Sequence, residues 1–277
     1  MALDQLQDID DKEMSFLDHL EELRWHLIRS ASAILVFSIA AFLAKDFVWS
    51  TIIFGPTKSD FWTFRKLCEL AEVINSPLLC LGENIPIDLQ NRQITGQFTM
   101  HIKSSIIVGL ILAFPYTFWE IWRFIKPGLR TKEQRASRGA VFVVSFLFLI
   151  GIAFGYYIVT PLSINFLANY TLADEIQNII DIVSLVGLVS TLALACGVMF
   201  QLPVVTYFLS KAGIISPKLM KTYRRHSIVV ILIISAVITP PDVISQLLIA
   251  LPLLLLYEIS IVISARIHKR MDKEYDL

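Results

Sequence analysis

Long apolar stretches constrain this chain more than any other feature of its sequence. One of them, Gly139 to Val159, is long enough to cross a bilayer, because about 20 helical residues at 1.5 Å each span the hydrocarbon core. Hydrophobic residues make up 55% of the chain and charged residues 17%, whereas about a quarter of an ordinary soluble domain is charged. These features argue against a soluble enzyme and indicate a membrane protein.

Hydropathy predicts six membrane-spanning helices in an all-α, concave bundle. The fifth predicted span has only eleven residues, far short of the roughly 30 Å core, so we expect the fifth and sixth spans to be short. Pro240-Pro241 follows the fifth span and removes two backbone donors, which predicts a tight reversal into the sixth. The predicted spans are Leu27 to Ala44, Phe98 to Phe118, Gly139 to Val159, Ile182 to Leu209, Ile228 to Ile238 and Val243 to Ser264.

Basic residues predict which connections face the cytoplasm. The connections 123–138 and 210–227 are rich in Lys and Arg, whereas 160–181 has neither. Since cytoplasmic loops of membrane proteins carry an excess of Lys and Arg, both termini are expected in the cytoplasm, which requires an even number of spans. The formal net charge is zero, from 24 basic and 24 acidic residues, so no bulk basicity points to nucleic acid as a partner.

The predicted organisation has three parts. Residues 1–26 form a cytoplasmic segment with an amphipathic helix, 27–264 the membrane domain, and 265–277 a cytoplasmic tail. The acidic start of the chain lacks the basic region of a secretory signal, so no cleaved leader is expected. The long connection 45–97 is nearly balanced in charge, and we expect it outside, as a cap on the bundle.

This external connection is predicted to contain a helix and two cysteines. Ser59 is expected to cap the helix at its N-terminus. Cys68 and Cys80 lie on the oxidising side of the membrane, so either they form a disulfide or they are two buried free thiols. The apolar face of the helix would hold Phe61, Phe64, Leu67, Cys68 and Ala71.

Common catalytic signatures are missing from the sequence. We find no G-x-x-x-x-G-K-[ST], no H-E-x-x-H, no G-x-S-x-G and no paired C-x-x-C. ATP hydrolysis and zinc proteolysis are therefore disfavoured, and we expect no enzymatic activity, no cofactor and no metal.

Two acids stand near the predicted cytoplasmic face. Glu22 lies on the amphipathic helix before the first span, and Glu133 is the only acid between Arg123 and Arg138. A solvated helix start and local charge neutralisation would explain them. The functional alternative is a carboxylate aimed at a cationic ligand, since a guanidinium and a carboxylate can form two parallel hydrogen bonds.

Other polar residues lie within or beside the predicted spans. Gln201 sits in mid-membrane, where Pro203 loosens the helix, and we expect it to face a hydrated concavity. Glu120 and Glu258 lie near the inner ends of the second and sixth spans and are expected to pair with Arg or Lys at the interface. Asp242 lies at the outer turn.

Four motifs stand in order along the chain: Phe16 to Arg24, Phe114-Pro115 followed by Phe124 to Leu129 and Glu133, Phe200 to Pro203, and Thr239 to Asp242. Together they resemble the TatC family, the multi-spanning receptor subunit of the twin-arginine (Sec-independent) protein translocase. The likeness covers about Met14 to Arg266.

The resemblance implies a function in the bacterial plasma (inner) membrane. Family members recognise twin-arginine signal peptides of folded cargo proteins and export that cargo with the proton-motive force. They act in multimeric complexes with single-span partners of the TatA and TatB type. The competing interpretation, an ion-coupled small-molecule transporter, is disfavoured because we find no convincing internal repeat and the acids lie mainly near the two faces.

The resemblance also implies roles for individual residues. Recognition of the signal's arginine pair would fall on Glu22 and Glu133, with Arg24 and Phe124 in the same surface. The family's polar position in the fourth span is often Glu, and Gln201 keeps the polarity there without a titratable group. Asp242 matches the family's outer-side Asp.

Overall fold

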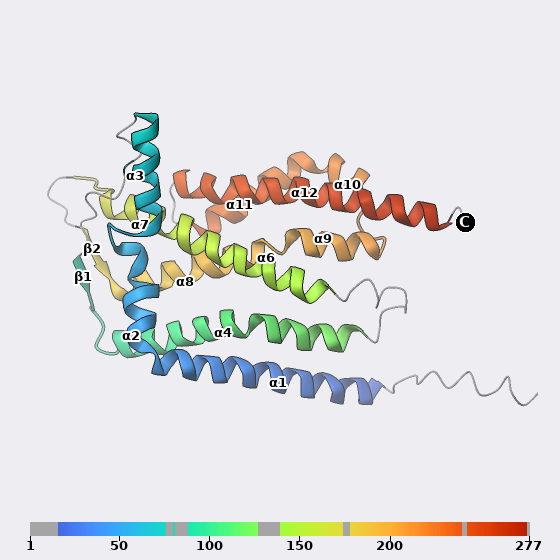
Figure 1. Ribbon diagram of the computed structural model, residues 1–277, viewed down its shortest axis with the longest axis horizontal. Helices are drawn as coiled ribbons and strands as arrows, with labels where there is room; N and C mark the ends of the chain where they lie inside the picture. The colour runs from blue at the N-terminus through green and yellow to red at the C-terminus, as the bar shows by residue number, and fades with distance from the viewer. Residues whose placement is uncertain are drawn as a thin grey trace, which may run out of the picture.

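The chain forms a bundle of long helices with a small structured cap at one end (Figure 1). The computed structural model describes residues 16–75, 80, 88–126, 139–173, 178–239 and 243–275. The all-α, polytopic membrane architecture predicted by hydropathy is confirmed. The helices of the bundle are α1 (Phe16–Leu43), α4 (Gly96–Ile125), α6 (Ala140–Phe154), α7 (Thr160–Asn169), α8 (Ile182–Met199), α9 (Leu202–Lys211), α11 (Arg224–Ile238) and α12 (Val243–Tyr275).

Within the described residues, five helical segments are long and apolar enough to cross a membrane. The predicted fifth span corresponds to α11, whose 15 residues reach only about 22 Å, so the expectation of a short fifth span is confirmed. The expectation of a short sixth span is wrong. The part of α12 that could cross a membrane, Gln246–Met271, has 26 residues. The whole helix has 33, because residues near its end such as Arg266 and Lys269 favour helix as well.

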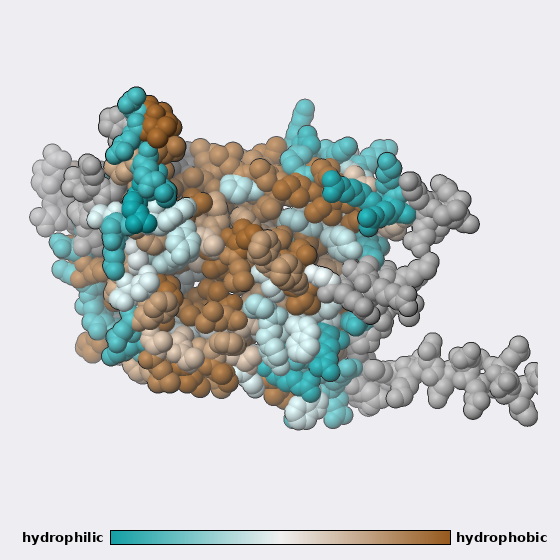
Figure 2. Space-filling view, in the orientation of Figure 1, coloured by the Kyte–Doolittle hydropathy of each residue, from teal (hydrophilic) through white to brown (hydrophobic). Residues whose placement is uncertain are grey.

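The surface of the molecule has an apolar middle and polar ends. Figure 2 shows hydrophobic side chains across the centre, with hydrophilic ones gathered toward the two ends. Leu35, Val36 and Phe142 are among the large apolar side chains that are more than half exposed. Such exposure is unfavourable in water and natural against lipid, so the bundle is built to lie in a bilayer.

Small residues let α1 and α4 approach closely along their length. A Cβ atom added to Gly109 of α4 would lie 2.7 Å from the Cα atom of Ser38 on α1. Toward one end of the same pair, the His101 ring stacks on Phe42 and its Nε2 lies 3.1 Å from the Phe42 carbonyl oxygen. Lipid provides no hydrophobic force between helices, so close packing and hydrogen bonds such as these hold the pair together.

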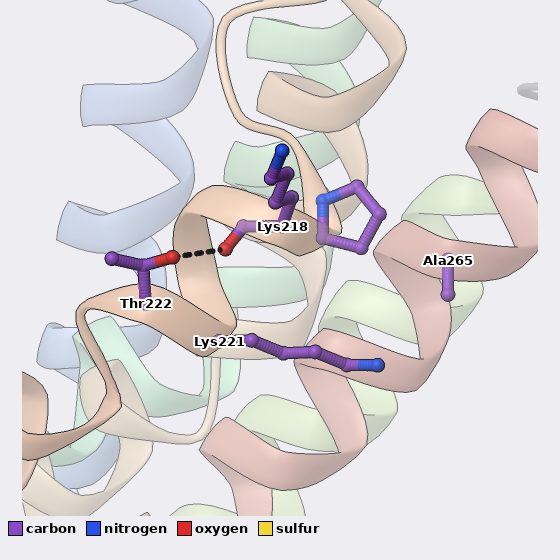
Figure 3. A pocket seen from close by; sticks show the side chains of 5 residues that line it. Lys218, Lys221, Thr222 and Ala265 are labelled. Carbon is purple, nitrogen blue, oxygen red and sulfur yellow. Dashed lines mark hydrogen bonds between the residues drawn. The ribbon is translucent and has the colours of Figure 1, made fainter.

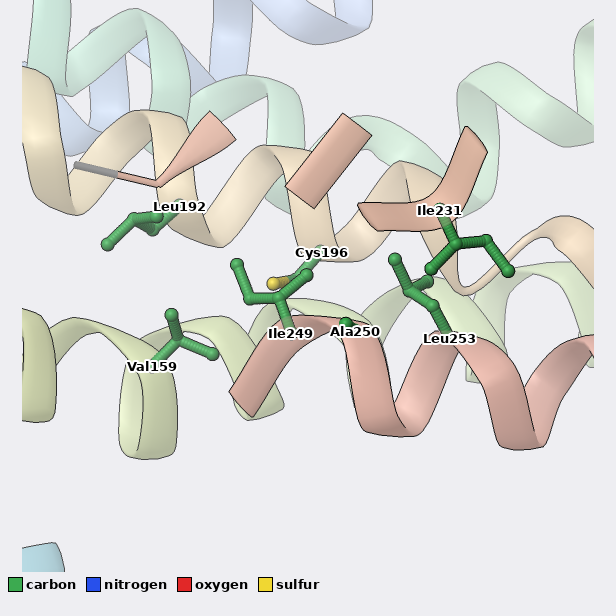
Figure 4. Close-up of a cluster of buried hydrophobic side chains, with 7 residues drawn as sticks. All are labelled: Val159, Leu192, Cys196, Ile231, Ile249, Ala250 and Leu253. Atoms are coloured by element: carbon green, nitrogen blue, oxygen red, sulfur yellow. The ribbon is translucent and has the colours of Figure 1, made fainter. Parts of the chain in front are cut away.

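A cluster of buried apolar side chains joins the short helix α11 to the rest of the bundle. It brings together a π-helical turn at Gly155–Val159, α8, α11 and α12 (Figure 4). Through it α11 is held against longer helices although it is too short to span a bilayer of ordinary thickness by itself. The buried members are Val159, Leu192, Cys196, Ile231, Ile249, Ala250 and Leu253.

The cap is built from the connection after α1. The chain passes through α2 (Lys45–Phe47), a π-helical turn at Val48–Ile53 and a 3-10 turn at Gly55–Thr57 into α3 (Trp62–Ile74), which stands across the end of the bundle (Figure 1). Two short parallel strands, β1 (Asp88–Gln90) and β2 (Ile179–Asp181), join this connection to the one after α7.

Two details of the cap bear on the sequence predictions. Ser59 does not cap α3, because the N-cap residue is Phe61 and has no side-chain capping bond. Phe61 instead packs on the rings of Tyr156 and Tyr157, 5.7 Å away between centroids in each case, so aromatic packing accompanies the start of the helix. The predicted apolar face is present in Phe64 and Ala71, which are buried.

Cys68 of α3 is joined to Cys80 by a disulfide, with their Cα atoms 4.2 Å apart. Without reductant, a maleimide added to the purified protein should therefore leave both cysteines unmodified, and after reduction it should label both. The Cys80→Ser variant is the matched control, since it should expose Cys68 to labelling without reductant. Free labelling of both cysteines in the unreduced protein would contradict the bridge.

The close approach at Gly109 predicts a steric effect. Gly109→Leu should lower the stability of the purified protein by about 1 to 3 kcal/mol, because the new side chain has no room against Ser38. Gly187→Leu in α8 is the control, since a Cβ atom there meets nothing within 4 Å. Thermal unfolding in detergent measures both. Equal melting temperatures for the two variants would show that the α1 and α4 contact is not tight.

Candidate functional site

The candidate site lies at the end of the bundle that holds the start of α1 and the end of α4. The short helix α10 (Pro217–Thr222) and the C-terminal part of α12 lie at the same end (Figure 1). We call it the basic end, because exposed Lys and Arg side chains collect there. They include Arg24, Arg123, Lys126, Lys218, Lys221, Arg225, Arg266, Lys269 and Arg270.

One face of α1 carries a row of polar side chains toward α4. α1 is a single helix of 28 residues, so Glu22, His26 and Ser30 follow one another at four-residue spacing on one face. His26 and Ser30 are buried, whereas the Glu22 side chain is 36% exposed. The Glu22 Oε1 atom lies 3.9 Å from His26 Nε2, which is too long for a hydrogen bond.

Glu120 on α4 is the buried acid of the site, with a side chain that is only 2% exposed. It accepts hydrogen bonds from His26 Nδ1 at 2.5 Å and from the Tyr116 hydroxyl at 3.0 Å. Arg29 Nη1 lies farther away, at 3.8 Å. A buried carboxylate is costly unless it is paired and hydrogen-bonded, and these partners supply that compensation.

Glu120 pairs with an arginine as expected, but its nearest partner was not expected. Arg29 Nη1 lies 3.8 Å from the carboxylate, whereas His26 Nδ1 is 2.5 Å away, because His26 points into the contact with α4 while the Arg29 side chain is 47% exposed. Glu258 also pairs as expected, with Arg224 at 2.6 Å. The importance of His26 was missed, although its position four residues after Glu22 was a usable signal.

Aromatic side chains complete the site on α4. The ring of Phe124 lies 6.1 Å from that of His26. Directly before Phe124, the Arg123 guanidinium lies over the ring of Trp119 from the preceding turn, 5.6 Å from its centre. Arg24 is exposed and forms no ion pair within the described part of the chain. Glu133 and Asp242 lie outside the described residues.

Gln201 lies where the fourth predicted span is interrupted. α8 ends at Met199 and α9 begins at Leu202, which agrees with the expected effect of Pro203. The Gln201 Nε2 atom donates to the Val144 carbonyl of α6 at 3.1 Å. Among the described residues, its buried Oε1 atom and the buried Ser145 hydroxyl have no hydrogen-bond partner. The amide is therefore turned toward α6 rather than toward lipid.

A cavity of about 520 Å³ also opens at the basic end, between α10 and α12. Lys218 and Lys221 line it together with Pro217, Thr222 and Ala265, and Thr222 donates a hydrogen bond to the Lys218 carbonyl (Figure 3). Two ammonium groups and no carboxylate line this cavity, so it would repel a cationic ligand. The α1 and α4 face, with its carboxylates, is the suitable place for one.

Comparison with known proteins decides the family. A family model described as "Sec-independent protein translocase protein (TatC)" matches residues 18–252. The chain belongs to the TatC family. It is thus a component of the twin-arginine translocase, the Sec-independent system of protein transport, and a membrane protein. Family membership weighs against the small-molecule transporter.

Individual relatives support the same conclusion. The TatC protein of Blattabacterium sp. subsp. Periplaneta americana is 38% identical over 93% of this chain and 97% of its own length. That of Helicobacter pylori strain 26695 is 36% identical over 90% of this chain and 87% of its own. A crystal structure of a twin arginine translocase receptor, TatC, superposes with a TM-score of 0.69 at 33% identity, covering 89% of this chain and 99% of that one.

The burial of Glu120 predicts unequal effects for two ion pairs at the basic end. His26→Ala should destabilise the protein by about 3 kcal/mol, because it leaves a buried carboxylate without its nearest donor. Arg224→Ala should cost no more than about 1 kcal/mol, since the side chains of that pair are each 49% exposed. Thermal unfolding of the purified variants measures both. An equal loss of stability in the two variants would contradict the larger contribution that we assign to the buried pair of Glu120.

Proposed function

We propose that this chain is the receptor for twin-arginine signal peptides and that it exports folded cargo with the proton-motive force. In this proposal the basic end faces the cytoplasm of a bacterium, both termini lie there, and single-span subunits of the TatA and TatB type complete the complex. The excess of Lys and Arg at that end supports the orientation. The relative of known structure is described as a receptor, which supports the role.

The position of Glu22 carries the proposal. Its carboxylate is partly exposed at the basic end, on the helix face that packs against α4. α4 ends at Ile125, and eight residues later the chain reaches Glu133. We propose that Glu22 and Glu133 together hold the two guanidinium groups of the signal, each charge-assisted bond contributing on the order of 1.5 to 3 kcal/mol.

Other residues have supporting roles in the proposal. Phe124 and Arg24 belong to the same recognition surface, Phe124 through the apolar edge that it provides beside His26. Gln201 and its surroundings accept the hydrophobic part of the signal when it inserts deeper, and the Gln201 amide offers polarity without titrating. Asp242 acts on the outer side.

The proposal predicts how peptide binding depends on the two acids. The Glu22→Gln, Glu133→Gln double variant should lose photo-crosslinking to an Arg-Arg signal peptide, because both carboxylates that would hold the guanidinium groups are neutralised. Wild-type protein should lose the crosslink in the same way when both peptide arginines become lysine. The purified full-length protein in detergent is suitable for the assay.

Glu21→Gln is the matched control, since Glu21 is the exposed neighbour of Glu22 on the same helix, and it should crosslink normally. Export of a folded reporter in cells gives a second measurement, and it should stop for the double variant and for wild type treated with an uncoupler. Normal crosslinking and export by the double variant would remove the basis for the assignment.

A further inference from the structure

We propose that Glu120 keeps Glu22 available to the signal peptide by holding His26 away from it. Glu120 and His26 would then be positioning residues, which act on recognition without touching the arginines themselves. The inference rests on the function proposed above, and it explains why an acid is buried inside the contact between α1 and α4.

The His26 ring lies between two carboxylates. Its Nδ1 atom is 2.5 Å from Glu120 Oε2, and its Nε2 atom is 3.9 Å from Glu22 Oε1. An ionised carboxylate can only accept, so the hydrogen of Nδ1 is donated to Glu120. The contact with Glu22 is longer than a hydrogen bond, which leaves the Glu22 oxygens open to another donor.

The difference in burial explains why His26 binds the inner acid. The Glu120 side chain is 2% exposed and that of Glu22 is 36% exposed. Attraction between a donor and a carboxylate is stronger where the effective dielectric constant is lower, so the buried acid is the better partner. The Tyr116 hydroxyl, 3.0 Å from Glu120 Oε1, further anchors the carboxylate in this position.

Removal of the Glu120 charge would reverse this preference. A glutamine at position 120 keeps the size of the side chain but offers only a neutral acceptor, and neutral hydrogen bonds are about half as strong as charge-assisted ones. Glu22 would then be the nearest carboxylate to His26 among the described residues. A bond between them would occupy the oxygens that a guanidinium needs, and Arg29, 3.8 Å from Glu120, would lose its partner as well.

Binding of a synthetic Arg-Arg signal peptide to the purified full-length protein tests the inference. Glu120→Gln should weaken the affinity about tenfold, whereas His26→Gln should bind at least as well as wild type. The His26→Gln, Glu120→Gln double variant should recover affinity to within about twofold of wild type, because the competing donor is gone. Glu258→Gln is the control for loss of an acid at the same end and should bind normally.

The rescue separates this role from a merely structural one. If the double variant binds as weakly as Glu120→Gln, or if His26→Gln weakens binding to the same extent, the pair only holds the helices together and the inference is overturned. Melting temperatures show whether a weak binder is still folded, and a folded double variant that binds normally supports the inference even if Glu120→Gln alone unfolds.

Glu22→Gln, measured in the same assay, separates failure of this inference from failure of the proposed function. Unchanged binding by Glu22→Gln would remove the proposed recognition site, and with it the role of Glu120. Lost binding by Glu22→Gln together with wild-type affinity for Glu120→Gln would overturn only the role given to Glu120.

Discussion

The contact between α1 and α4 determines where the candidate site can form. Three kinds of interaction hold it together along its length: a ring and carbonyl contact at Phe42 and His101, close backbone approach at Gly109, and the His26 to Glu120 hydrogen bond at the basic end. In lipid, where apolar burial brings no gain, such contacts have to supply helix association. The site therefore lies at the end of a closely packed helix pair, which suits the placement of a carboxylate for a ligand.

The rest of the bundle follows the same rule. Close approach recurs between α6 and α8, where a Cβ atom on Gly151 would lie 2.6 Å from the Cys196 carbonyl oxygen. α11 is short for an ordinary bilayer, and it is held by the apolar cluster that it shares with α8 and α12. A short helix in this setting favours local thinning of the membrane beside it. The bilayer thins there so that its hydrocarbon thickness matches the short apolar length of the helix.

Sequence patterns predicted which segments form long apolar helices better than they predicted contacts. The interruption at Phe200 and Gln201 follows from Pro203, which lacks a backbone donor, and it was predicted correctly. The ion pair of Glu120 with an arginine, Arg29, was also predicted, but its nearest partner, His26, was not. Hydropathy says nothing about how α1 is rotated against α4, and that rotation brings His26 closer to Glu120 than Arg29. Ser59 failed as a cap because Phe61, packed on two tyrosines, begins the helix instead. The length of α12 was underestimated because the polar residues after its apolar stretch also favour a helix, which hydropathy does not detect.

Three acids at the basic end differ in side-chain exposure and in how closely they are paired, and these differences decide which of them can bind a ligand. Glu120 is buried and bonded to His26, and Glu258 is half exposed and bonded to Arg224 at 2.6 Å. Glu22 is intermediate in exposure, and its nearest basic partner among the described residues is 3.9 Å away. A fully buried acid cannot meet a ligand, and one already paired at short distance would have to give up its partner first. Glu22 alone among the three combines access with an unoccupied carboxylate, which is the property that a site for an arginine pair requires.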